Sequence, residues 1–136
     1  MRWVADRWVV PARPVAAPGC TIVSVPPDRV TAFHDELDLV AGRLRVKRGG
    51  GAAGHNGLRS MDRRLGTPEY WRVRLGIGHP GSKERVQGHV LGNFAKADEG
   101  WLAALLDALA DAAPLLASDK PEEFMTRVAL LTQETR

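Results

Sequence analysis

Near the middle of this 136-residue chain stands a run of six small residues, Gly49–Gly54, of which four are glycine. Glycine loses more backbone freedom on folding than any other residue, so this run predicts a loop rather than a helix or strand interior. The residues on either side follow regular patterns. Arg43–Lys47 alternates basic and apolar side chains as a half-exposed strand does, and Leu58, Met61 and Leu65 form one helical stripe. The centre of the chain therefore predicts a strand, a glycine-rich loop and a helix.

Residues that favour helix ends and turns mark the limits of these elements. Asn56 can cap the helix after the glycine-rich run, and Gly66 can end it. Upstream, the apolar run Val30–His34 predicts a buried strand, with a loop over residues 35–38 at its carboxyl end. Downstream, Tyr70–Ile77 alternates apolar and basic residues, which predicts a strand with one solvated face.

The C-terminal part is predicted to be mainly helical. Val86–Phe94 is interrupted by glycines and is interpreted as a short extended segment. Asp98–Ala112 predicts a helix that bends or ends near Pro114, because proline lacks the N–H that a helix needs. A last short helix is expected to start around Pro121. Alternating strands and helices predict an α/β fold, a single domain with α/β/α layers around a mixed sheet.

The first 29 residues differ in composition from the rest. They hold five prolines, and their β-branched run Thr21–Val25 could form an edge strand. We therefore divide the chain into a Pro-rich segment, residues 1–29, and a folded domain, residues 30–136. The single cysteine, Cys20, excludes an internal disulfide. No stretch approaches the roughly 18 to 20 apolar residues of a membrane span, so no membrane partner is expected.

Positive charge is concentrated in the middle third of the chain. Residues 43–90 hold 11 basic and 3 acidic side chains, whereas the whole chain carries a net charge of +3. Such an excess indicates either a polyanionic partner such as nucleic acid or a solvated basic face. Arg45, Lys47 and Arg74 alternate with apolar neighbours on two predicted strands, on an exposed face able to meet phosphates. The four histidines show no metal-ligand spacing, so no metal site is predicted.

Two further groups of residues place polar chemistry at element ends. Asp35 follows a predicted buried strand, at the sheet edge where α/β proteins place their ligand clefts. Its carboxylate could orient an imidazole, as acidic partners do in hydrolases, or it could cap a turn. Gly54, His55 and Asn56 open a helix, where backbone amides could face a substrate carbonyl or phosphate. Asn56 could equally be a plain helix cap.

Four motifs follow one another in order: FHDELDL at residues 33–39, KRGGGAAGHNGLRS at 47–60, RVRLGIGHPG at 72–81 and HVLGNF at 89–94. Together they closely resemble the bacterial-type peptidyl-tRNA hydrolase family, over about residues 28–117. The resemblance implies an α/β fold, truncated at the N-terminus relative to the family. It also implies a cytoplasmic, monomeric enzyme whose partner is tRNA and which cleaves the ester between a peptide and the tRNA 3′ end. It implies no metal or organic cofactor.

The resemblance assigns roles to individual residues. It implies that Asp35 is the acid that orients the catalytic histidine. The positions that match Gly54, His55 and Asn56 line the family's cleft near the scissile ester. Lys47 and Arg74 match positions associated with tRNA contact, and Arg45 is their neighbour.

The family's N-terminal third, which contains the histidine that acts as general base, has no match in the first 30 residues, and those residues contain no histidine. His34 should face away from the cleft, because adjacent residues of a strand point to opposite faces. His55 is a weak candidate for a replacement base. Three hypotheses remain: an ester hydrolase, a non-catalytic tRNA-binding relative and an unstable fragment without function. The missing match fits a divergent replacement, a degenerate remnant or a misassigned start.

Overall fold

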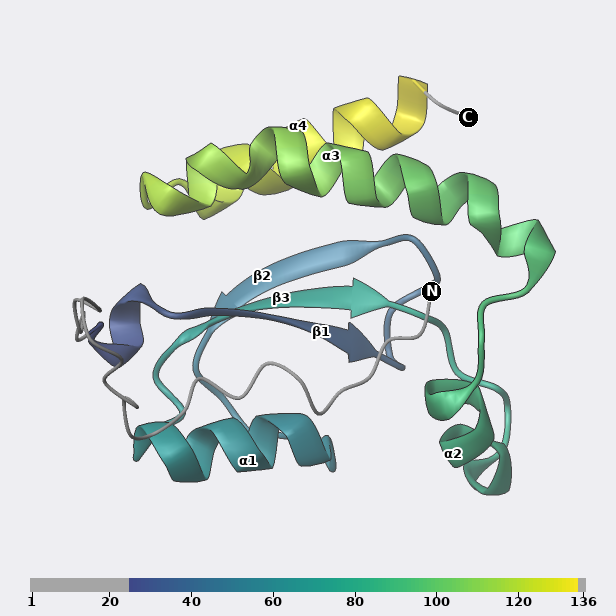
Figure 1. Cartoon of the computed structure of the whole chain (residues 1–136), viewed down its shortest axis with the longest axis horizontal. Coiled ribbons are helices and arrows are strands. Elements are labelled where there is room, and N and C mark those ends of the chain that lie inside the picture. The colour runs from purple at the N-terminus through teal and green to yellow at the C-terminus, as the bar shows by residue number, and fades with distance from the viewer. Residues whose placement is uncertain (1–24, 135–136) are drawn as a thin grey trace, which may run out of the picture. The chain divides into compact units, whose positions relative to one another are not determined.

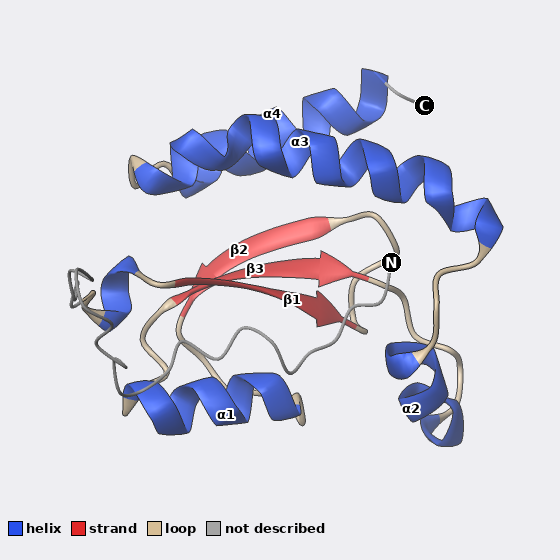
Figure 2. Cartoon of the chain, viewed as in Figure 1, coloured by secondary structure: helices blue, strands red, loops and turns tan. Residues whose placement is uncertain are grey.

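The computed structural model of the chain describes residues 25–134, and Figures 1 and 2 show its strands and helices. The strands are β1 (Thr31–Glu36), β2 (Leu44–Arg48) and β3 (Trp71–Gly76). The helices are α1 (Asn56–Leu65), α2 (Lys83–Leu91), α3 (Glu99–Ala117) and α4 (Pro121–Glu134). Two single 3₁₀ turns, Pro27–Arg29 and Lys96–Asp98, precede β1 and α3.

The three strands form one sheet in the order β1-β3-β2. Backbone bonds from Trp71 N to Val30 O and from Ile77 N to Glu36 O rise together along both strands, so β1 and β3 are parallel. Bonds join Gly49 N to Tyr70 O and Gly76 N to Arg43 O, so residue numbers fall along β2 as they rise along β3. These two strands are therefore antiparallel. The arrows in Figure 2 show the same directions. The prediction of an α/β fold with a mixed sheet is confirmed.

The described residues form two compact units, one of residues 25–32 and 48–72, the other of residues 33–47 and 73–134. In the first unit the predicted stripe of α1 packs toward the sheet. Its Leu58 is buried with Ala32 and Tyr70 in a small core. The partly buried residues packed against this core are Val30, Ala52, Met61 and Leu65.

The second unit holds the larger core. There, α3 and α4 lie side by side in Figure 1 and pack against strands β2 and β3. The buried residues of this core are Leu44, Val73, Leu105, Ala108, Leu109, Ala112, Phe124 and Val128. Leu44 and Val46 alternate on β2, so the predicted strand has one face toward this core.

The helix ends follow local chemistry. Gly66, with φ of 73°, ends α1 in the left-handed conformation that glycine adopts without strain, as predicted. The helix α3 does not stop at Ala112 but continues through Pro114 to Ala117, because a proline near a helix end removes only one backbone bond. Asp119 then adopts φ of 57°, and bonds from its N–H and that of Lys120 to Leu116 O and Leu115 O close the helix. The last helix begins at Pro121, as predicted.

Three other predictions of local structure are wrong. Val86–Phe94 is not extended, because residues 83–91 form α2. Asp35 and Glu36 belong to β1 rather than to the loop after it, since their backbones continue the pairing with β3. The basic side of Tyr70–Ile77 is not wholly solvated, because Arg72 is completely buried. The proposed edge strand Thr21–Val25 lies outside the described residues except for Val25.

One helix also departs from the membrane expectation. The segment Lys96–Ala117 is long and apolar enough to cross a membrane by length and composition alone. Its apolar residues include Leu105, Ala108 and Leu109, which are buried in the core of the second unit. Only 22% of the most apolar stretch of this segment is buried within the described residues, so these core residues are a minority of it.

Candidate functional site

Besides the buried Arg72, strands β2 and β3 place three basic side chains on one face of the sheet. The bond pattern between the strands places Arg45 directly opposite Arg74. Lys47 is two residues beyond Arg45 and therefore shares its face. The other face of the same strands carries the apolar side chains that meet α3 and α4. We call Arg45, Lys47 and Arg74 the cationic face.

The three members of the cationic face differ in their partners. Arg45 is exposed, and its Nη1 donates to the carbonyl oxygen of Leu44 at 3.1 Å. Lys47 is half-buried and has no acidic partner within residues 25–134. Arg74 Nε donates to Glu36 Oε2 at 2.9 Å, with the two side chains 24% and 14% exposed. Like charges opposite each other on a sheet repel, so Glu36 offsets part of the repulsion between Arg45 and Arg74.

Glu36 is a member of this site that the sequence analysis missed. Burial raises the pKa of its carboxyl, but the bonds from Arg74 and from the Asp38 amide outweigh that effect. The charge of His34 acts in the same direction, and the pKa of Glu36 lies below its usual value. The sequence signal was its position beside Asp35 on a strand that pairs with β3. The prediction of a loop over residues 35–38 is wrong for Asp35 and Glu36, and it conceals their alternation on β1.

Asp35 lies on β1, between two residues that face the other side of the sheet. Because side chains alternate along a strand, Asp35 points to the face opposite to that of Glu36. His34 Nδ1 contacts the backbone oxygen of Asp35 at 2.7 Å. His34 thus lies on the opposite side of the strand from the Asp35 side chain, as the alternation predicts.

The start of α1 is built around the His55 ring. His55 has extended backbone angles, φ of −72° and ψ of 111°, and its Nδ1 accepts a 3.2 Å hydrogen bond from the Leu58 amide. His55 is therefore the N-cap, and the prediction that Asn56 caps the helix is wrong, because Asn56 is already helical. Asn56 is exposed. Gly57 makes room for the ring, since a Cβ there would lie 2.8 Å from His55 Cε1.

A buried guanidinium supports the loop that leads into α1. Arg72 is fully buried, and its Nη1 donates to the carbonyl oxygen of Gly51 at 2.9 Å. Its Nη2 lies 3.3 Å from Asp62 Oδ1, and the guanidinium stands 4.8 Å from the centre of the Tyr70 ring. No local pattern indicates this role, because Arg72 and Arg74 occupy equivalent places in the alternation of β3.

The Tyr70 hydroxyl completes the cluster. It donates a 2.8 Å hydrogen bond to Asp62 Oδ1. Burial and the bond to the Asp62 carboxylate together raise the pKa of Tyr70 to about 12, although the Arg72 charge acts in the opposite direction. Tyr70 is therefore a neutral hydrogen-bond donor at ordinary pH, and its role is to hold Asp62 in place.

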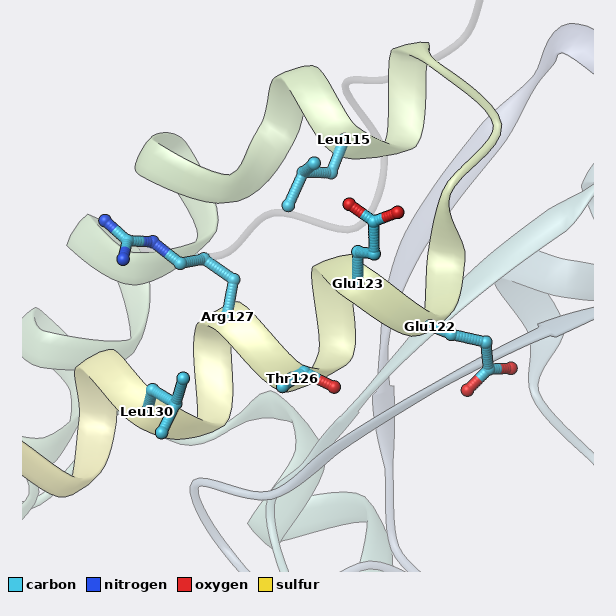
Figure 3. A pocket seen from close by; sticks show the side chains of 6 residues that line it. All are labelled: Leu115, Glu122, Glu123, Thr126, Arg127 and Leu130. Atoms are coloured by element: carbon cyan, nitrogen blue, oxygen red, sulfur yellow. The ribbon is translucent and has the colours of Figure 1, made fainter.

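The second unit also has an open groove of about 400 Å³ between α3 and α4 (Figure 3). Leu115 and Leu130 supply its apolar lining. Two of its charged residues already have partners, since Glu123 pairs with Lys120 and Arg127 pairs with Asp111. No predicted site residue lines it. Within residues 25–134 there is also no group of three or more His, Cys, Asp or Glu residues that could hold a metal ion.

The structure brings the predicted site residues together in two groups. Arg45, Lys47 and Arg74 share one face in the second unit, whereas Asp35, on β1 of the same unit, points to the opposite face. The other group is the sequence Gly54, His55 and Asn56 at the start of α1, in the first unit. The first group offers cations to a polyanion, and the second offers a helix N-terminus with an imidazole and an amide.

Known proteins resemble this chain in sequence and in structure. The family described as Peptidyl-tRNA hydrolase matches residues 15–136. A peptidyl-tRNA hydrolase of Granulibacter bethesdensis is 75% identical over 115 residues, which cover 85% of this chain and 59% of the relative. One from Acidiphilium cryptum is 71% identical over 118 residues, which cover 87% of this chain and 62% of the relative.

Solved structures show the same likeness. The crystal structure of peptidyl-tRNA hydrolase from Acinetobacter baumannii matches with a TM-score of 0.67 and 40% sequence identity. The match covers 75% of this chain and 52% of that chain. The chain therefore spans about half to three-fifths of the length of the proteins that it matches.

Proposed function

Because the chain belongs to the peptidyl-tRNA hydrolase family, we propose that it binds the acceptor end of peptidyl-tRNA and hydrolyses the ester between the peptide and the tRNA 3′ end. The observation that carries the proposal is the cationic face. Three basic side chains from two adjacent strands stand together, and two of them have no acidic partner in the described part of the chain. Phosphate oxygens are the partners that such an array fits.

The resemblance to the family assigns a chemical role to Asp35 and another to the start of α1, each taken by itself. Asp35 orients an imidazole and stabilises its protonated form during attack of water on the ester carbonyl. Amides at the start of α1 donate to the oxygen on which negative charge develops, and the Asn56 side chain helps to fix the substrate. The histidine that Asp35 would orient is not identified among the described residues.

Binding is tested by titrating tRNA against the chain at several salt concentrations. Three phosphate contacts predict that log affinity falls with log salt concentration with a slope of about −2 to −3. Lys47→Ala and Arg45→Ala should each weaken binding and flatten the slope by about one. Arg127→Ala is the matched control, because Arg127 is an exposed arginine on α4, outside the cationic face. Unchanged binding in Lys47→Ala and Arg45→Ala would contradict the assignment of the face.

Hydrolysis is tested with purified N-acetyl-aminoacyl-tRNA as substrate. Turnover that falls by about 10² to 10⁴ in Asp35→Asn supports an orienting acid that works with a histidine. A comparable loss in His55→Ala, with tRNA affinity preserved, would show that the His55 ring also takes part in hydrolysis. Absence of turnover in a chain that binds tRNA would contradict the hydrolase assignment.

A second candidate function is a non-catalytic tRNA-binding relative. It is favoured by the way in which His55 is used, because its Nδ1 accepts the Leu58 amide as the cap of α1. This relative would keep the salt-dependent affinity for tRNA and show no hydrolysis. The turnover measurement separates the two functions.

The proposal extends to setting and assembly. A protein that acts on peptidyl-tRNA works in the cytoplasm, where translation takes place, and we propose that this chain acts there as a monomer with tRNA as its partner. Sedimentation of the chain with and without tRNA tests the monomer, which a concentration-dependent increase in mass without tRNA would contradict.

A further inference from the structure

The glycine-rich loop before α1 holds an improbable backbone conformation. Gly49, Gly50 and Gly54 have φ of 65°, 97° and 84°, and Ala53 has φ of 46°. Alanine rarely adopts a positive φ, and a run of glycines has many other conformations available. Ordering this loop therefore requires contacts that select one conformation from many.

Contacts at three points fix the loop. Its beginning is held by the bond from Gly49 N to Tyr70 O at 3.0 Å. Its end is held by the bond from His55 N to Ala52 O at 2.8 Å. Between them, Arg72 Nη1 donates to the Gly51 carbonyl oxygen at 2.9 Å. Arg72 thus fixes the part of the loop that lies between its two backbone ties.

The surroundings of Arg72 show that its guanidinium is held firmly in place. Nη2 contacts Asp62 Oδ1 at 3.3 Å and Pro68 O at 3.4 Å, and the guanidinium stands over the Tyr70 ring. Tyr70 in turn donates to the same oxygen of Asp62. The orientation of the Arg72 fork is therefore determined by groups on α1 and on the segment just before β3.

Burying a guanidinium stabilises a core poorly, because the charge loses its hydration. The side chain is 0% exposed, and its Nε has no hydrogen-bond partner in the described part of the chain. An apolar side chain of similar size often serves stability as well or better, and buried ionic groups are better explained where they select one conformation. The conformation that Arg72 can select is that of the loop whose carbonyl it binds.

We propose that Arg72 is a positioning residue, which acts through Gly51 to present Gly54, His55 and Asn56 to the 3′ end of the substrate. This inference rests on the proposed function for the identity of the ligand. The ordering of the loop itself does not depend on that function. Arg72 touches no substrate; its effect is on the conformation of residues that do.

Hydrogen exchange of backbone amides in the full chain without RNA tests the ordering. In Arg72→Lys, which keeps the charge but loses the planar fork, exchange of the His55 amide should rise on the order of tenfold. The Leu109 amide in α3 should change less than about twofold, because it reports on the second unit. Equal acceleration of both amides would mean a general loss of stability and would overturn the proposal, as would an unchanged His55 amide.

A milder variant keeps the test decisive if Arg72→Lys does not fold. Tyr70→Phe removes only the hydroxyl that holds Asp62, and it should raise exchange of the His55 amide by about two- to fivefold. Arg127→Lys is the matched control, since its partner Asp111 lies on α3. It should leave the His55 amide unchanged. In a chain where Arg72→Lys fails to fold, an unchanged His55 amide in Tyr70→Phe overturns the proposal.

Binding then separates this inference from the proposed function. The probes are an acceptor-stem hairpin RNA with an N-acetyl-aminoacyl 3′ end and the same hairpin without its 3′ single strand. Arg72→Lys should weaken the first about tenfold and the second less than about twofold. Equal weakening of both would overturn positioning. If the wild-type chain binds neither RNA, the proposed function fails, and the exchange measurement still decides whether Arg72 orders the loop.

Discussion

Arg74 on β3 holds Glu36 on β1 by a 2.9 Å hydrogen bond, although 38 residues separate them in the sequence. The pair joins β1 to β3, the central strand of the three. Arg74 is also a member of the cationic face. Glu36 also places a negative charge beside a cation that is proposed to meet phosphate. The pair therefore affects two properties, the stability of the sheet and the electrostatic potential at the cationic face.

The first prediction concerns acid stability. The pKa of Glu36 is lowered in the folded chain, so its pair contributes stability above the pKa of the unfolded carboxyl, near 4.5. That contribution is lost as pH falls through the folded pKa. We expect the unfolding free energy from urea titrations to fall below about pH 4.5 by a larger amount in the wild type than in Glu36→Gln. Parallel curves for the two proteins would contradict this linkage.

The second prediction concerns the affinity for tRNA. Glu36→Gln removes the charge that Arg74 now neutralises, so tRNA should bind about two- to tenfold more tightly at low salt. Asp111→Asn is the matched control, because it removes the acidic partner of Arg127 away from the cationic face. We expect little change in that variant. Filter binding or fluorescence titration measures both, and weaker binding by Glu36→Gln would show that Arg74 does not meet phosphate.

The third prediction separates the cap of α1 from its chemistry. His55→Ala removes the acceptor for the Leu58 amide and should lower the unfolding free energy by about 1 kcal/mol. His55→Asn restores a good capping side chain and should recover most of that loss. Asn56→Ala should change stability by less than about 0.5 kcal/mol, because Asn56 is not the cap. Urea unfolding checks all three, and a loss of about 1 kcal/mol or more in Asn56→Ala would contradict the assignment.

The fourth prediction concerns the loop that follows β1. A Cβ at Gly76 would collide with the carbonyl oxygen of Val40 and lie 2.9 Å from the Leu39 carbonyl oxygen. Both neighbours are backbone and cannot move independently, so Gly76→Ala should cost about 1 to 3 kcal/mol. Gly88→Ala is the control, since Gly88 lies in α2 with open space around its Cβ position. It should raise stability by about 0.5 to 1 kcal/mol, and thermal unfolding of the two variants tests this contrast.

The sequence was sufficient where a strong pattern coincided with a clear stop. The alternation in Arg43–Lys47, the stripe on α1 and the terminating Gly66 all correspond to structure within a residue or two. It was insufficient for α2, because Gly88 inside the helix, Gly92 at its cap and the lack of any buried residue conceal a helix. Pro114 did not set the end of α3, because a proline close to a helix end removes only one backbone bond.

The candidate site was predictable in outline but not in its pairings. Alternation places Arg45, Lys47 and Arg74 on one face, yet it gives the same description to Arg72. Arg72 is buried because it binds the carbonyl oxygen of Gly51 in the glycine-rich loop, whereas Arg74 has no contact with that loop among the bonds described above. Likewise, Glu36 becomes a partner of Arg74 because β1 lies beside β3. Both facts depend on tertiary neighbours that no local pattern contains.

The order of strands in the sheet also governs how the chain can fold as it is made. The strand in the middle, β3, is the last of the three in sequence, so β1 and β2 pair with it and not with each other. During synthesis from the N-terminus, neither can complete its described pairing until residues 71–76 have left the ribosome. Until then both strands are exposed to chaperones and to other nascent chains, and the time that the ribosome takes to reach β3 sets how long that exposure lasts.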